Sequence, residues 1–215
     1  MTQQLNLKEI ERKAFRSTFQ DGLWDVYLGL IVICMAFFLF RPDEGYSLKN
    51  QLIMLVGFGL SGLVFFAGKM LITVPRMGQV SFGPLRKRKA MTLAIILGAV
   101  VLVQAGIVLF TVGGWLDDDL AAKLNALLGE ANLERMAVAA VGSLFVGPSM
   151  ILVAYFSDFP RGYYIAILMA AAVFLMILLN QPIYAILIGA LIILPGLVLF
   201  IRFLQKYPLP KRGDS

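Results

Sequence analysis

The stretch IYAILIGALIILPGLVLFI, residues Ile183–Ile201, decides the fold of this chain. It contains no charged residue and is close to the roughly 20 apolar residues that a helix needs to cross a bilayer. Because hydrocarbon offers no hydrogen-bond partners, a spanning segment must pair its backbone amides within itself, as a helix does. The stretch therefore predicts a transmembrane helix.

Five further charge-free apolar runs precede it along the chain. They are Val26–Phe40, Leu52–Gly68, Met91–Val112, Met136–Phe156 and Tyr163–Leu179. The first run reaches spanning length if Gly22, Leu23 and Trp24 are included, and the second does so by carrying Lys69 near its end. We predict an all-α, polytopic integral membrane helical bundle with about six transmembrane helices, spanning about 23–40, 52–74, 91–112, 136–156, 163–179 and 183–201.

Composition supports a membrane protein and argues against most enzymes. Hydrophobic residues make up 60% of the chain and charged residues 15%, whereas about a quarter of the residues of a soluble domain are charged. The chain has no histidine, which removes the commonest metal ligand and general base. Its single cysteine, Cys34, lies inside the first span and cannot form an intramolecular disulfide. We therefore expect no metal, no cofactor and no catalysis.

The residues on either side of the six spans define two smaller segments. In residues 1–22, Leu7, Ile10, Ala14 and Phe15 recur at helical spacing with charged residues between them, which predicts an amphipathic interfacial helix on the cytoplasmic side. Residues 23–204 form the transmembrane domain. Residues 205–215 are basic and proline-containing, and we expect a flexible tail.

Lys and Arg residues alternate in abundance between successive connecting segments. Starting from the N-terminus, alternate segments carry four, five, one and four of them, and the segments between carry two, two and none. Because cytoplasmic segments carry this excess, both termini are predicted to be cytoplasmic. The net charge of +6 is then concentrated on one side. Arg86, Lys87, Arg88 and Lys89 are candidate contacts for anionic lipid headgroups, and we expect no nucleic acid partner.

A second group of charged residues is predicted at the cytoplasmic ends of the spans. Asp21, Asp25, Arg76, Asp158 and Arg161 belong to this candidate inner-rim polar cluster. Arg76 and Arg161 each follow a proline directly after a span, and proline ends a helix while holding its predecessor extended. Either arginine could pair with one of the three aspartates. Such pairs could fix the helix ends, bind phospholipid headgroups or gate a pathway.

Two prolines lie inside apolar runs and are candidate helix-break positions. Pro148 and Pro195 fall at matching depths in the fourth and sixth spans, where proline removes a backbone donor and loosens the preceding turn. Broken helices near the midplane occur in transporters, so these positions favour the alternative of a small-solute transporter or channel. Gly57, Gly59 and Gly62 match a dinucleotide-binding pattern, but inside a membrane helix they predict, with Ser61, a small-residue face for close helix approach.

Three short patches resemble sequences of an uncharacterised family of prokaryotic multi-pass membrane proteins. They are Asp21–Asp25 (DGLWD), Pro75–Phe82 (PRMGQVSF) and Phe159–Arg161 (FPR). The resemblance implies a location in the plasma, or inner, membrane of a prokaryote and implies no activity. We therefore expect an integral membrane protein that acts as an accessory, assembly or lipid-interacting component, with a membrane protein or a second copy of itself as possible partner.

Overall fold

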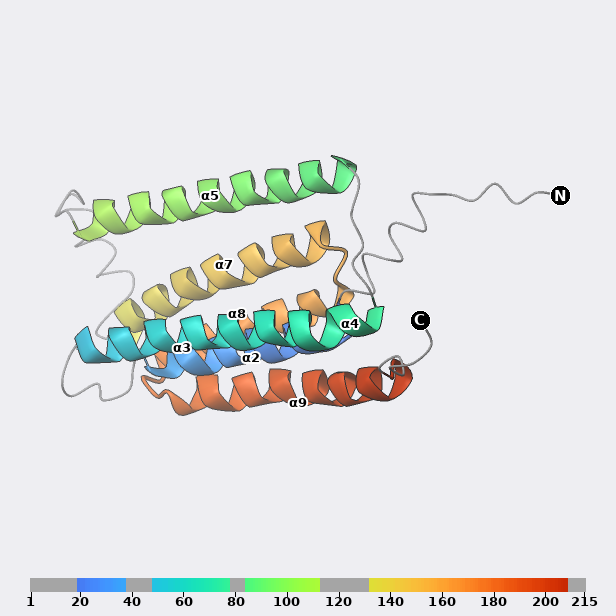
Figure 1. The fold of residues 1–215 in the computed structure, drawn as a ribbon. Coiled ribbons are helices and arrows are strands. Elements are labelled where there is room, and N and C mark those ends of the chain that lie inside the picture. Colours follow the sequence, from blue (N-terminus) through green and yellow to red (C-terminus); the bar gives the residue numbers. More distant parts are fainter. Residues whose placement is uncertain (1–18, 38–47, 78–83, 113–131, 209–215) are drawn as a thin grey trace.

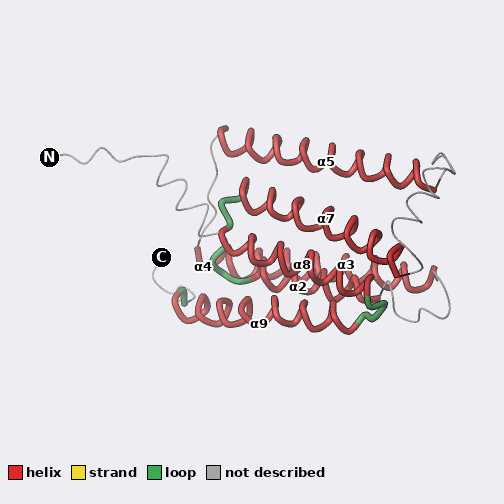
Figure 2. Tube along the Cα trace, turned by 180° about the vertical axis from the view of Figure 1, so that it is seen from behind, coloured by secondary structure: helices red, strands yellow, loops and turns green. Residues whose placement is uncertain are grey.

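The computed structural model describes residues 19–37, 48–77, 84–112 and 132–208, and these ranges are helical, with no strand. The elements are α2 (Leu23–Ala36), α3 (Leu48–Gly68), η3 (Lys69–Thr73), α4 (Val74–Met77), α5 (Pro84–Val112), α7 (Asn132–Phe156), α8 (Pro160–Leu178) and α9 (Ile183–Lys206). Consecutive long helices alternate in direction and lie roughly side by side (Figure 1; Figure 2 shows the reverse side). Most of the predicted N-terminal helix, residues 1–18, and the tail from 209 lie outside the described residues.

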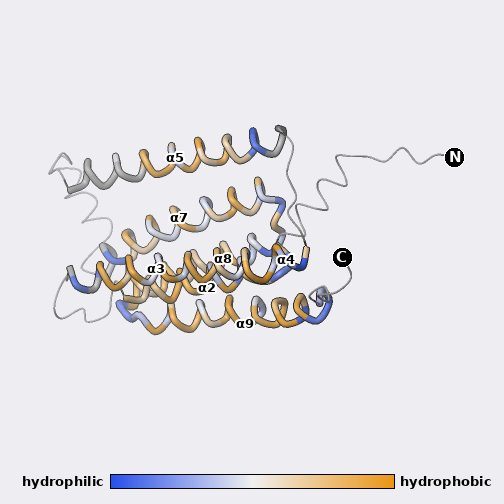
Figure 3. The backbone as a smooth tube through the Cα atoms, in the orientation of Figure 1, coloured by the Kyte–Doolittle hydropathy of each residue, from blue (hydrophilic) through white to orange (hydrophobic). Residues whose placement is uncertain are grey.

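Four of the described helical segments are long and apolar enough to cross a membrane. They are Gln51–Met77, Val138–Phe156, Pro160–Leu178 and Ile183–Lys206. Helix α2 is a shorter apolar helix of 14 residues, and α5 is a helix of 29 residues that contains the whole run Met91–Val112. The described helices are apolar along their middles (Figure 3). The fold is thus all-helical with four candidate spans, and the count of six remains a prediction.

Many large apolar side chains point outward from the helices. Leu71 and Leu102 are each 74% exposed and Leu63 is 67% exposed. Soluble proteins rarely leave large contiguous apolar surface in water, but in a bilayer these side chains meet lipid chains as apolar as themselves. The inverted surface is what a helical bundle solvated by hydrocarbon should show.

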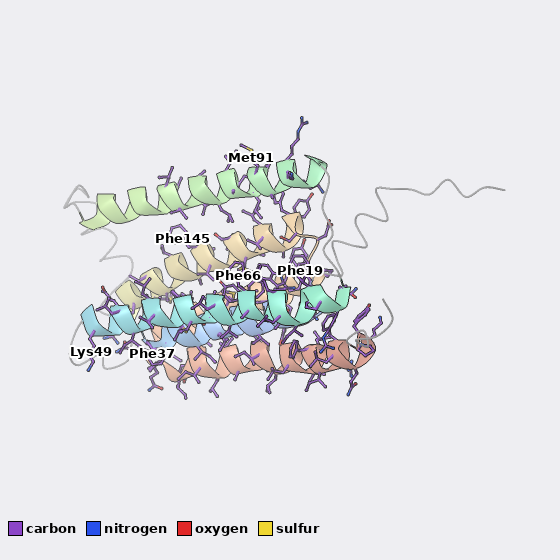
Figure 4. All side chains as sticks on the ribbon, viewed as in Figure 1. Phe19, Phe37, Lys49, Phe66, Met91 and Phe145 are labelled. Atoms are coloured by element: carbon purple, nitrogen blue, oxygen red, sulfur yellow. The ribbon has the colours of Figure 1, made fainter. Side chains whose placement is uncertain are left out.

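The buried core lies between α2, α8 and α9, with α7 packed along α8. Val32 of α2 is 0% exposed and Ile192 of α9 is 1% exposed. Met169 and Ala166 contribute from α8. Helix α5 makes its main contact with α7 and stays exposed elsewhere, with Met91 66% exposed (Figures 1 and 4).

Paired glycines bring α2 and α9 into close contact. Gly22 lies against Gly196, where an added Cβ would be 2.2 Å from the Gly196 carbonyl oxygen. Gly29 lies against Gly189, and a Cβ on either would be 2.8 Å from the other's carbonyl oxygen. The two glycines on each chain segment are two helical turns apart, so they share a face, and the antiparallel helices match them in reverse order. Small residues permit this backbone approach.

The predicted small-residue face on α3 is confirmed only in part. A Cβ at Gly57 would meet Cys34 Sγ at 2.8 Å, and the buried Ser61 hydroxyl lies 3.8 Å from the same sulfur. A Cβ at Gly59 or Gly62 would meet no atom within 4 Å. Among the described residues, these two glycines therefore admit no neighbouring helix, because they sit on a different side of α3.

The turns on both sides of α8 use the same backbone device. Asp158 and Asn180 each have a φ of 50°, a left-handed conformation that Asp and Asn tolerate better than most residues. The amide of Phe159 donates to the Ala154 carbonyl oxygen (2.9 Å), and that of Gln181 to the Met176 carbonyl oxygen (3.2 Å). These bonds close the preceding helices as Schellman motifs. Each turn therefore reverses the chain within a few residues.

Candidate functional site

Most of the buried polar side chains among the described residues lie where α2 begins, around a fully buried carboxylate. Asp21 is 0% exposed. Its Oδ2 accepts hydrogen bonds from Lys69 Nζ at 2.6 Å and from Thr73 Oγ1 at 2.7 Å, and its Oδ1 accepts one from the backbone amide of Leu23 at 3.2 Å. A buried charge is tolerable only when it is paired and hydrogen-bonded, and Asp21 meets both conditions.

The helix that supplies Lys69 and Thr73 is locally wound as a π-helix. Residues Lys69–Thr73 form one π turn between α3 and α4, and the amide of Val74 donates to the Lys69 carbonyl oxygen. Pro75 follows immediately, lacks an amide hydrogen and would press its ring against the carbonyl of the fourth residue before it. The wider turn relieves that clash and points Lys69 and Thr73 together at Asp21. Single π turns are frequent at functional sites.

A second buried carboxylate lies one turn further along, in α2. Asp25 is 3% exposed, and its Oδ2 is 3.4 Å from Arg161 Nη1. Arg161 Nη2 also donates to the backbone oxygen of Phe19. The same guanidinium lies 5.6 Å from the ring centre of Phe159. Arg161 thus ties the beginning of α8 to α2 and to the segment before it.

Arg76 ties a further pair of elements at the same end of the bundle. Its Nη1 donates to the backbone oxygen of Tyr207 at 2.7 Å. Tyr207 is the residue directly after α9, so α4 and the end of α9 are joined. Unsatisfied carbonyls at a helix C-terminus carry partial negative charge, which a cation stabilises.

Aromatic rings surround the first two carboxylates. Phe19 stacks on Trp24 (centroids 5.5 Å apart) and on Phe159 (5.0 Å), and Phe65 packs against Trp24 at 4.7 Å and Tyr27 at 4.9 Å. The ammonium of Lys69 lies 5.8 Å from the Phe65 ring centre. The carboxylate side chains in the two ion pairs are 0% and 4% exposed, and burial of this kind strengthens an electrostatic attraction relative to water.

The structure brings together part of the predicted inner-rim polar cluster. Arg161 contacts Asp25, one of the pairings left open, whereas Asp21 contacts Lys69 and Arg76 contacts a backbone oxygen. Asp158 occupies the left-handed turn position before α8. From here, "charged cluster" means Asp21, Asp25, Lys69, Thr73 and Arg161.

Lys69 and Thr73 are the cluster members that were not identified from sequence. A lysine close to the end of an apolar run was the available signal, because a cation at that depth needs an anion. The partner of Lys69 could not be predicted, because Asp21 lies 48 residues earlier in the sequence. Which side of the helix faces Asp21 also depends on the π turn.

The candidate headgroup residues lie at the beginning of α5. Lys87, Arg88 and Lys89 are exposed, and the side chain of Arg86 lies outside the described residues. Figure 1 places this end of α5 at the same end of the bundle as α4 and the α7–α8 turn. Three cationic side chains at that end are therefore accessible to lipid headgroups.

The two candidate helix-break prolines sit within continuous helices. Helix α7 runs from Asn132 to Phe156 through Pro148, and α9 runs from Ile183 to Lys206 through Pro195. Both proline side chains are exposed. They therefore lie on the outer surface of the described bundle and not between its helices.

The described residues contain no group of three or more Cys, Asp or Glu side chains placed to hold a metal ion. No protein-family model, curated protein or solved structure matches the chain. The geometry of the charged cluster, the basic start of α5 and the apolar surface therefore carry the functional argument.

Proposed function

We propose that this protein is a non-catalytic integral membrane protein, an accessory, assembly or lipid-interacting component of a prokaryotic plasma membrane with both termini in the cytoplasm. The observation that carries the proposal is the mutual pairing of charges in the charged cluster. Each of its carboxylates is engaged by a cation from another helix. Carboxylates engaged in this way fix helix ends in place, whereas a catalytic acid or base must be able to reach a substrate.

The partner that best fits the exposed cations is the anionic surface of the cytoplasmic leaflet. Lys87, Arg88 and Lys89 lie on the first turns of α5, directly before the apolar run that begins at Met91. Basic residues beside a spanning helix attract anionic lipid by about 1 kcal/mol each. Together they hold α5 at a fixed depth in the bilayer.

The experiment compares the wild-type protein with a Lys87→Ala/Arg88→Ala/Lys89→Ala variant in nanodiscs containing phosphatidylglycerol or phosphatidylcholine. Native mass spectrometry counts the lipids retained after release into mild detergent. We expect the wild-type protein to retain phosphatidylglycerol preferentially and the triple variant to lose most of that preference while staying folded. A folded triple variant with unchanged preference would contradict the assignment of this lipid contact.

The same purification tests the non-catalytic role against transport. Single cysteines beside Pro148 and Pro195, in a Cys34→Ala background, are exposed to a water-soluble thiol reagent. Burial in lipid and protein predicts slow labelling at both positions. Fast labelling at both, slowed by a co-purifying solute, would identify a water-filled pathway and overturn the accessory role.

A further inference from the structure

An apolar groove lies at the opposite end of the bundle from the charged cluster, between the end of α2 and the beginning of α3. Its volume is about 590 Å³, within the range of small-molecule sites. Phe37 lines one side, and Leu52, Val56 and Leu60 of α3 line the other. Figure 4 labels Phe37 and Lys49 at this end. Among the described residues that line it, the charged one is Lys49.

The groove opens sideways, along the outer surface of α3. Leu52, Val56 and Leu60 follow one another at intervals of four residues, so they form one row along the helix. They are 52%, 59% and 56% exposed. In a membrane this row faces the lipid chains, which gives the groove an apolar floor parallel to the direction in which those chains run.

The described residues at the mouth of the groove include one cation, Lys49. Lys49 is exposed, lies in the first turn of α3, and forms no ion pair or hydrogen bond with another part of the described chain. The N-terminal end of a helix adds partial positive charge through its unpaired amides. The groove thus combines a long apolar floor with one cationic side chain, that of Lys49, at its end.

We propose that this groove binds an anionic phospholipid, with one acyl chain along the Leu52–Leu60 row and the phosphate at Lys49. Among the described residues that line the groove, Lys49 is the charged one and the others are apolar. A peptide partner would find few groups there for its polar atoms to bond, whereas an acyl chain needs no such bonds. The site is separate from the basic start of α5, at the other end of the bundle, and does not depend on the proposed function.

The test uses the full chain reconstituted in vesicles of phosphatidylcholine doped with a photoactivatable phospholipid that carries its reactive group midway along one acyl chain. The headgroup is either phosphatidylglycerol or phosphatidylcholine, and peptide mass spectrometry maps the crosslinks. We expect phosphatidylglycerol to label residues 52–60 about fivefold more than phosphatidylcholine does, the effect of one charge near the surface. Lys49→Glu should abolish that difference, and Lys49→Arg should keep it.

A matched pair of variants controls for general lipid contact. Val56 lines the groove and is 59% exposed, whereas Val64 lies two turns further along α3, outside the groove, and is 58% exposed. Val56→Trp should fill the groove and lower labelling of residues 52–60, and Val64→Trp should leave it unchanged. Equal labelling by the two lipids, or labelling spread evenly along α3, would show that the groove contacts lipid no more specifically than the rest of the surface and would contradict the proposal.

Discussion

At the scale of single residues, Asp21 is the group whose environment is most demanding. A carboxylate with no exposed surface has lost its hydrogen bonds to water, and here Lys69, Thr73 and the amide of Leu23 replace them. Removing one partner of a buried ion pair costs more than the pair itself contributes, because the other charge is left without compensation. In this pair the loss falls on Lys69, whose side chain is 18% exposed.

Asp21→Ala should lower the free energy of unfolding by about 3–5 kcal/mol, because it removes the buried carboxylate that forms an ion pair with Lys69. Thermal unfolding in mild detergent, followed by tryptophan fluorescence, measures the effect. The double variant Asp21→Ala/Lys69→Met should recover much of the lost stability, since it removes both charges. Lys89→Ala, on the exposed start of α5, is the control and should change little. A double variant no more stable than Asp21→Ala would contradict the assigned pairing.

At the scale of elements, the contact between α2 and α9 depends on small residues. A methyl group at Gly189 would be 2.8 Å from the Gly29 carbonyl oxygen and 2.5 Å from Ile33 Cγ1, and crowding of this kind typically costs about 1–3 kcal/mol. Gly189→Ala should therefore destabilise the protein, as seen by a lower midpoint of thermal unfolding. The matched control is Gly59→Ala in α3, where a Cβ meets no atom within 4 Å.

The control should be neutral or slightly stabilising, because alanine is the better helix former by about 0.5–1 kcal/mol. A Gly189→Ala variant as stable as Gly59→Ala would show that the α2–α9 contact is looser than the structure indicates. The comparison separates loss of a packing surface from the general effect of replacing a helical glycine.

The same two helices show how far sequence reasoning reaches. The run Ile183–Ile201 predicted α9 because spanning length and the neighbouring prolines are local properties. The matching of Gly189 and Gly196 to Gly29 and Gly22 was not predictable, because glycines far apart in sequence gain meaning only once the helices face each other. Gly59 and Gly62 illustrate the reverse error: their spacing indicated a contact face, but their side of α3 meets no described helix.

The charged cluster divides in the same way. Placing Asp25 and Arg161 at one end of the bundle followed from where the apolar runs stop, and their pairing was among the alternatives that the sequence left open. The partner of Asp21 was missed because it depends on the rotation of α3, which the π turn before Pro75 sets. The thickness of the hydrocarbon layer sets where each spanning helix begins and ends, so these boundaries can be predicted from the length of an apolar run. The rotation of a helix about its axis sets which side chains meet, and an almost uniformly apolar run does not determine that rotation.

At the scale of the whole molecule, the long helices alternate in direction (Figure 1), so one experiment that places a single connecting segment inside or outside the cell fixes the orientation of the others. The beginning of α5 and the turn between α8 and α9 lie at opposite ends of the bundle. Lys87 and Gln181 are exposed at these two places. The excess of Lys and Arg predicts the first in the cytoplasm and the second outside.

In a Cys34→Ala background, Lys87→Cys and Gln181→Cys give each end one thiol. A reagent that cannot cross the membrane should label Gln181→Cys in intact cells and label Lys87→Cys only after the cells are opened. Cys34 is the one cysteine of the chain, so in its absence any labelling comes from the introduced thiol. Labelling of Lys87→Cys in intact cells would show that the orientation is opposite to the predicted one, with the basic start of α5 on the outer surface. The anionic lipid that we assign to α5 could then not come from the cytoplasmic leaflet, because the basic residues at the start of α5 would face the outside of the cell.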